Sequence, residues 1–171
     1  MSKKFGNPIK EIVFTVPDDY EHDTQLETFV QNIKNKDSKY QYNINFLDKN
    51  FKKISHKLVP GKNYDIKFIP VLESVSNEDC LYEYRRQNAV LVGAQGLTSL
   101  QCIHPNEFPI GKWSLSFDER YNLWEDGDSR HRVPSVYRGS DGDWNFYLDY
   151  FECDRDHEDM LICFCEQILE D

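Results

Sequence analysis

The chain has 171 residues, of which 39% are hydrophobic and 14% aromatic, and its formal net charge at pH 7 is −10. A chain of this length can fold without disulfide or metal crosslinks, and its aromatic content excludes intrinsic disorder. No apolar run approaches the roughly eighteen residues that span a bilayer, and the N-terminal stretch lacks the apolar core of a signal peptide, so we expect a cytoplasmic protein with no membrane partner.

Alternation of apolar and polar residues predicts strands in the first seventy residues, over 12–16, 40–46 and 64–68. A weaker strand is expected over 51–58. Between the first two strands, Thr24 and Glu27 have capping-box spacing ahead of an apolar stripe at helical intervals. This pattern predicts a helix that ends near Asn35.

The middle of the chain is expected to hold two more helices. Ser76 or Asn77 can cap a helix that runs to about Gln87, with its inner side formed by Cys80, Leu81 and Tyr84. A short buried strand over 89–92 then leads through Gly93-Ala94-Gln95-Gly96, expected to be a turn, to a short helix over 97–103.

Residues 111–152 hold all three tryptophans and read as a β-meander, with strands over 113–117, 133–137 and 144–151. Asp141-Gly142 between two alternating runs is a hairpin signal, and Pro134 suggests an edge strand or a bulge. A final strand is expected over 160–165. The predicted fold class is therefore α+β, with a mainly antiparallel sheet and two or three short packing helices.

Charge divides the chain unevenly. Residues 1–70 carry twelve Lys and nine acidic residues, a net charge of +3, whereas residues 71–171 carry eight basic and twenty-one acidic residues, a net charge of −13. We predict one compact unit over 1–171, or two packed halves: a Lys-rich β-α-β-β half (1–72) and an acidic half with a helix and the meander (73–171).

The leading functional prediction is a non-enzymatic protein-interaction module or inhibitor that presents an acidic surface to a basic protein partner. An acidic surface repels phosphates, so a nucleic acid partner is not expected. The predicted partner-binding edge consists of Asp141, Asp143, Asp149, Glu152, Asp154, Asp156, Glu158 and Asp159. The oligomeric state is left open, no cofactor is required, and a structural subunit whose charge serves only solubility is a further alternative.

Part of this acidic stretch also resembles a calcium-binding loop in its spacing. Its oxygen-bearing residues fall at positions 1, 3, 5, 7, 9 and 12 of such a loop, namely Asp141, Asp143, Asn145, Tyr147, Asp149 and Glu152. However, Phe146 occupies the sixth position, where the loop needs glycine to turn. Alternation along a strand explains the same spacing and is the favoured interpretation.

A divalent-metal-dependent hydrolase, of the nuclease or phosphoesterase kind, is the alternative function. Its metal ligands for Ca²⁺ or Mg²⁺ would be Asp126, Asp128, Asp141 and Asp143, if the meander brings its loops to one end. The Gly93–Gly96 segment could also form a phosphate cradle, but without the rest of a nucleotide-binding motif a tight turn is favoured.

Five cysteines are present, an odd number, and their spacing matches no zinc-binding pattern. Cys163 and Cys165 alternate with apolar residues, so we expect both on one buried face of a strand. The cysteines are therefore predicted to be reduced, structural thiols.

Overall fold

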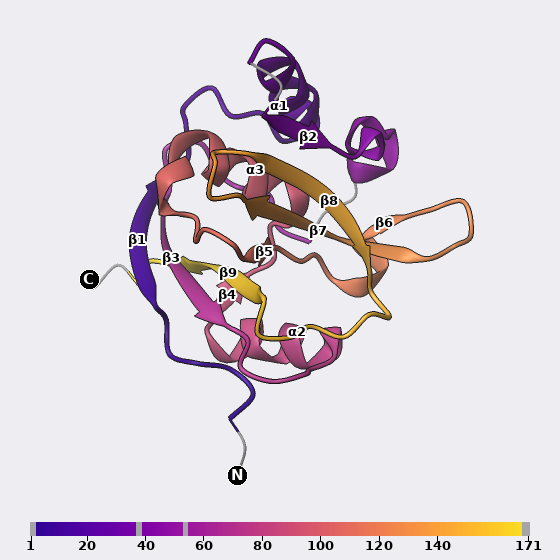
Figure 1. Cartoon of the computed structure of the whole chain (residues 1–171). Helices are drawn as coiled ribbons and strands as arrows, with labels where there is room; N and C mark the ends of the chain where they lie inside the picture. The colour runs from indigo at the N-terminus through magenta and orange to yellow at the C-terminus, as the bar shows by residue number, and fades with distance from the viewer. Residues whose placement is uncertain (1–2, 37–38, 53–54, 169–171) are drawn as a thin grey trace.

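A nine-stranded mixed sheet and three α-helices form an α+β fold in the computed structural model, which describes residues 3–36, 39–52 and 55–168 (Figure 1). The strands are β1 (Lys10–Thr15), β2 (Tyr40–Tyr42), β3 (Asn63–Pro70), β4 (Ala89–Val90), β5 (Trp113–Leu115), β6 (Trp124–Glu125), β7 (His131–Arg138), β8 (Trp144–Tyr150) and β9 (Asp159–Glu166). The α-helices are α1 (Gln25–Lys34), α2 (Asn77–Arg86) and α3 (Gly93–Ile103). Short 3₁₀ helices are η1 (His22–Thr24), η2 (Ile44–Leu47), η3 (Lys49–Lys52), η4 (Pro105–Glu107) and η5 (Arg120–Asn122).

The sheet runs in the order β1-β3-β9-β5-β7-β8-β2, with β4 also paired to β9 and β6 to β7. The three strands of the predicted meander, β5, β7 and β8, are antiparallel neighbours. The expectation of a mainly antiparallel sheet is nevertheless wrong, because β9 lies parallel to β5 and β2 lies parallel to β8. The last strand crosses over to the middle of the sheet instead of continuing the meander.

Helices cover both faces of this sheet (Figure 1). One face packs against α1 and α3 in a cluster that contains Phe29, Leu97 and Phe146, and the other packs against α2 in a cluster that contains Leu81, Phe117 and Cys163. Strand β9 separates the two clusters, so all but the last of its eight residues are buried. Cys163 and Cys165 both belong to the α2 cluster, as their alternation predicted.

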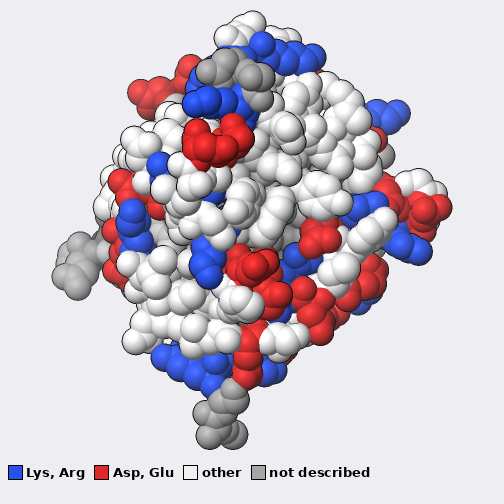
Figure 2. Space-filling view, in the orientation of Figure 1, with Lys and Arg blue, Asp and Glu red and all other residues white. Residues whose placement is uncertain are grey.

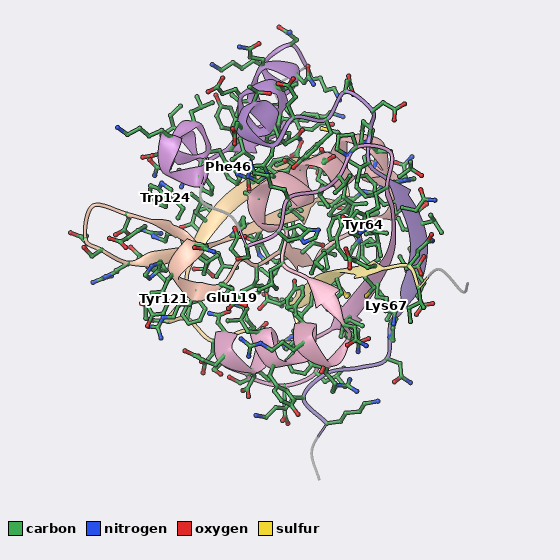
Figure 3. The ribbon with its side chains drawn as sticks, turned by 180° about the vertical axis from the view of Figure 1, so that it is seen from behind. Phe46, Tyr64, Lys67, Glu119, Tyr121 and Trp124 are labelled. Carbon is green, nitrogen blue, oxygen red and sulfur yellow. The ribbon has the colours of Figure 1, made fainter. Side chains whose placement is uncertain are left out.

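Aromatic rings extend the α1–α3 cluster toward β6. The rings of Phe46 and Phe51 stack with centroids 5.5 Å apart, and Phe51 stacks on Trp124 at 5.7 Å. Figure 3 labels Phe46 and Trp124, which lie near each other at the upper left of that view. Offset stacking adds stabilisation beyond the burial of area, so these three rings fix η2 and η3 against β6.

The second predicted strand is shorter than its alternation suggested. Strand β2 ends at Tyr42, because the Asn43 side chain accepts a hydrogen bond from the Asn45 N–H (2.9 Å) and starts the 3₁₀ helix η2. The weak strand predicted over 51–58 is also wrong for the residues that are described there, since 51–52 belong to η3 and 55–58 to no strand.

Helix positions agree better with prediction than helix caps do. Helix α1 lies where expected, but the Thr24 side chain makes no capping hydrogen bond to the helix. Helix α2 has the complete capping box that its sequence allowed: the Ser76 hydroxyl accepts from the Asp79 N–H (3.1 Å), and the Asp79 carboxylate accepts from the Ser76 N–H (3.2 Å).

Pro134 lies inside the sheet and not at its edge. It pairs with Leu148 of β8, and its carbonyl on the other side accepts from the Ser116 N–H (3.2 Å). The Asp141-Gly142 hairpin is confirmed, with Gly142 at φ +87° in the turn that joins β7 to β8. Strand β3 of the Lys-rich half pairs with β9 of the acidic half, while the division into halves stays a prediction.

Within the described part of the chain, no helix is both long and apolar enough to cross a membrane.

Candidate functional site

The predicted acidic edge does not form one continuous surface. Asp141 and Asp143 lie in the β7–β8 turn, whereas Glu152 to Asp159 follow the opposite end of β8. The seven residues of β8 separate the two groups by roughly 23 Å at the usual rise of a strand. In Figure 2, acidic side chains gather at the lower right, over the segment that joins β8 to β9 in Figure 1.

Five of the eight predicted residues line one pocket in that region, whose volume is about 260 Å³. These are Asp149, Asp154, Asp156, Glu158 and Asp159, and Arg155 lies among them. The formal net charge of the lining is therefore −4. The rest of the lining comes from Trp113 and Leu115 of β5, Ser135 of β7 and Tyr147 of β8. Glu152 is exposed in the same loop but does not line the pocket.

Strand register explains why the β5, β7 and β8 residues meet here. Leu115 lies opposite Ser135, which lies opposite Tyr147 on the next strand. Cross-strand partners point to the same face of a sheet, and so do residues two apart on one strand. Trp113 and Asp149 therefore share this face, which is the one covered further along by α2. The ring of Trp113 lies 6.1 Å from that of Tyr147.

The loop over 151–158 forms the acidic wall, and Arg155 holds it in place. Its guanidinium donates to the Asn77 amide oxygen (3.0 Å), to Asp149 Oδ2 (2.7 Å) and to the Tyr150 carbonyl (2.8 Å). Only 3% of Arg155 is exposed. Its backbone also exchanges two hydrogen bonds with Val75 just before α2. The charge of Arg155 is thus used within the fold, where it neutralises Asp149.

Removal of this guanidinium has a predictable cost. We expect Arg155→Ala to lower the free energy of unfolding by about 3 kcal/mol, because a buried pair is broken and the Asn77 oxygen loses its donor. Arg85→Ala is the matched control, since Arg85 makes only an exposed 3.7 Å pair with Glu119, worth about 0–1 kcal/mol. Urea denaturation measures both, and equal losses would show that Arg155 does not anchor the loop.

Asp159, the first residue of β9, is the most buried of the carboxyl groups that line the pocket, at 8% exposure. Its Oδ2 accepts from the Asp156 N–H (2.9 Å), and Asp156 Oδ1 accepts in turn from the Glu158 N–H (2.9 Å). Burial raises the pKa of Asp159 above its usual value, although the Asp156 N–H and Arg155 oppose that rise. The nearby Asp156 and Asp149 carboxylates add to the rise in this pKa.

The four carboxylates proposed as metal ligands do not meet. Asp126 and Asp128 lie in the β6–β7 turn and Asp141 and Asp143 in the β7–β8 turn, at opposite ends of the eight residues of β7. Asp126 instead accepts hydrogen bonds from the Asp128 N–H (2.9 Å), the Arg130 N–H (3.0 Å) and Arg132 Nε (2.9 Å). Among residues 3–36, 39–52 and 55–168, no three His, Cys, Asp or Glu side chains are placed to hold a metal ion.

The residue spacing that resembles a calcium-binding loop is the alternation of a β-strand. Residues 144–150 form β8, so Asn145, Tyr147 and Asp149 project to one face of the sheet instead of wrapping around an ion. Phe146, at the position that needs glycine, is fully buried in the α1–α3 cluster.

The Gly93–Gly96 segment, a candidate phosphate-binding site, is not accessible to a ligand. Gly93 is the first residue of α3 and not part of a separate turn, and residues 93–101 are all buried. The Asp118 carboxyl group lies against Gly93 at the helix start. Asp118 Oδ1 accepts from the Ser55 N–H (3.1 Å), and burial raises the pKa of Asp118 to about 7. A side chain of the protein thus occupies the place that an anion would need.

Sequence reasoning identified the acids of the pocket but not its aromatic wall or the role of Arg155. Trp113 and Tyr147 lie on predicted strands, yet only the pairing of β7 with both neighbours brings their rings together. The sequence feature that pointed to the pocket is the Asp-x-Asp-x-Glu-Asp run over 154–159, after β8. Hydrogen bonds within this turn hold its carboxylates in place.

Comparisons with known proteins give no relative. No protein-family model matches the chain, and searches of curated proteins and of solved structures find no significant match. Function must therefore be argued from the residues of the pocket.

Proposed function

We propose that the protein is a non-enzymatic interaction module that binds a basic protein partner through the acidic pocket and the 151–158 loop. The observation that carries this proposal is the gathering of five carboxylates and two aromatic rings in one pocket, with a formal net charge of −4. Complementary charge steers association and rejects partners of the same sign. Because all five cysteines are free thiols, we further propose the reducing cytoplasm as its location.

This function fits the geometry better than the metal-dependent hydrolase. Hydrolysis by that route needs convergent acids around an ion, and Asp126 and Asp128 lie at the far end of β7 from Asp141 and Asp143. It also fits better than a structural subunit with charge for solubility alone. Charge for solubility has no need of five carboxylates that converge with two aromatic rings on one pocket.

The test is the binding of a peptide of alternating lysine and glycine, followed by fluorescence anisotropy. We expect the affinity to fall as salt rises from about 0.01 M to about 0.15 M, which shortens the Debye length from about 30 Å to about 8 Å. The triple variant Asp154→Asn, Asp156→Asn, Glu158→Gln should lose about tenfold in affinity at low salt, because it removes three charges of the acidic wall.

A variant with the same change in net charge provides the control. Asp18→Asn, Asp19→Asn, Glu21→Gln removes three exposed carboxylates from the loop between β1 and η1, outside the pocket. We expect it to lose at most about twofold. Equal losses in the two triple variants, or an affinity that does not depend on salt, would refute the proposed function.

A further inference from the structure

The pocket combines two features that suit one kind of ligand. Trp113 and Tyr147 supply ring faces, and Tyr147 is 43% exposed. Asp154, Asp156 and Glu158 are exposed along the other wall. A flat organic cation interacts favourably with both, through cation–π attraction to the rings and hydrogen bonds to the carboxylates. Among the described residues, no three His, Cys, Asp or Glu side chains are grouped so that they could hold a metal ion instead.

Elsewhere in the fold, an arginine already lies between an aromatic ring and a carboxylate. The guanidinium of Arg132 lies 3.6 Å from the ring centroid of Tyr150 and donates from Nε to Asp126 Oδ2 (2.9 Å). Here one strand end supplies an aromatic face and a neighbouring turn supplies the carboxylate. The pocket repeats the arrangement with Tyr147 and Trp113 beside the acidic loop.

Size restricts the ligand. About 260 Å³ is less than the roughly 300–1,000 Å³ of pockets that hold drug-sized molecules, yet it is ample for one long side chain. The basic groups nearby do not fill it. Arg155 is paired with Asp149, and the Lys112 ammonium donates to the His157 carbonyl (2.6 Å).

Asp159 offers a carboxylate oxygen to a ligand in the pocket, because its Oδ1 accepts no hydrogen bond from the described residues. It is only 8% exposed, and within the described residues its only side-chain hydrogen bond is the one that Oδ2 accepts from Asp156. Arg155 lies close enough to oppose the rise in the pKa of Asp159 but does not cancel it. A second cation beside Asp159 would compensate its charge, which burial otherwise disfavours.

We infer that this pocket binds a single arginine side chain of the basic partner, with the guanidinium against Trp113 and Tyr147 and its N–H groups toward Asp159 and Glu158. The inference rests on the proposed function and adds the identity of the anchoring residue. Arginine is preferred to lysine because its planar guanidinium stacks on rings and pairs with carboxylates through two parallel hydrogen bonds, whereas an ammonium is a compact, strongly hydrated charge.

The experiment compares two peptides of equal charge: the lysine–glycine peptide, and the same peptide with its central lysine replaced by arginine. We expect the wild-type protein to bind the arginine peptide about fivefold more tightly. Trp113→Leu and, separately, Tyr147→Leu should abolish this preference, so that each variant binds the two peptides with affinities equal within about twofold. Tyr147 is exposed, so its variant keeps the test decisive if Trp113→Leu fails to fold.

The outcomes separate the two proposals. Equal affinity of the wild type for both peptides, or a preference that survives in Tyr147→Leu, overturns the arginine pocket while salt-dependent binding keeps the proposed function. Failure of both peptides to bind overturns the proposed function as well. A preference that disappears in Glu158→Gln but persists in Asp18→Asn would add support for the pocket over general charge.

Discussion

Gly93→Ala is expected to lower the free energy of unfolding by about 4 kcal/mol. Two costs add. Gly93 has φ +57°, a region that costs an L-residue about 1–2 kcal/mol. A Cβ at this position would also overlap the Asp118 carboxyl group, and overpacking in a core costs about 1–3 kcal/mol.

Two other glycines separate these costs. Gly111 has φ +76°, but a Cβ added there would have no atom within 4 Å, so Gly111→Ala should show the backbone cost alone, about 1–2 kcal/mol. Gly127 has neither feature, and Gly127→Ala should stay within about 0.5 kcal/mol of the wild type. Denaturant titration of the three variants gives the comparison. A Gly93→Ala loss equal to that of Gly111→Ala would exclude the steric contribution of Asp118.

Asp118→Asn should remove a strong dependence of stability on pH. Because burial raises the pKa of Asp118 from 3.8 to about 7, the folded state keeps a proton that the unfolded state has lost between those two values. Stability of the wild type therefore falls as pH rises through this window, by about 4 kcal/mol in total at 1.36 kcal/mol per pH unit. Asparagine does not titrate and retains an oxygen for the Ser55 N–H.

The measurement is the difference in unfolding free energy between variant and wild type at several pH values. Between about pH 5 and about pH 7.5 the difference should move by about 3 kcal/mol in favour of the variant. Other acids, such as Asp79, whose pKa Lys4 lowers, titrate equally in both proteins and cancel. A difference that stays constant with pH would mean that Asp118 does not carry its proton near neutrality in the folded protein.

Asp118 and Gly93 also show why the sequence could not reveal this contact. Twenty-four positions separate them, and each looked ordinary alone: a glycine before a helix and an aspartate after a strand. The hydrogen bond from the Gly93 N–H to the Phe117 carbonyl (2.9 Å) places the start of α3 against this aspartate. No local propensity encodes that approach.

Local patterns determined which segments become strands and helices. Alternation placed β1, β3, β7 and β8, and the helical stripe placed α1, because these periodicities reflect one buried face of each element. The same logic failed for residues 43–46, where Asn43 bonds to its own backbone and converts an alternating run into η2. A short side-chain hydrogen bond there outweighs the apolar pattern.

Tertiary structure alone decided which elements meet. Sequence predicted the acidic character of the C-terminal half, but the strand order put five of the eight predicted acids around one pocket and left Asp141 and Asp143 at the far end of β8. It also brought Trp113 beside Tyr147 and buried Arg155 behind the acidic loop. Charge is a property of composition, whereas a site requires convergence, and convergence depends on long-range strand pairing that local sequence does not encode.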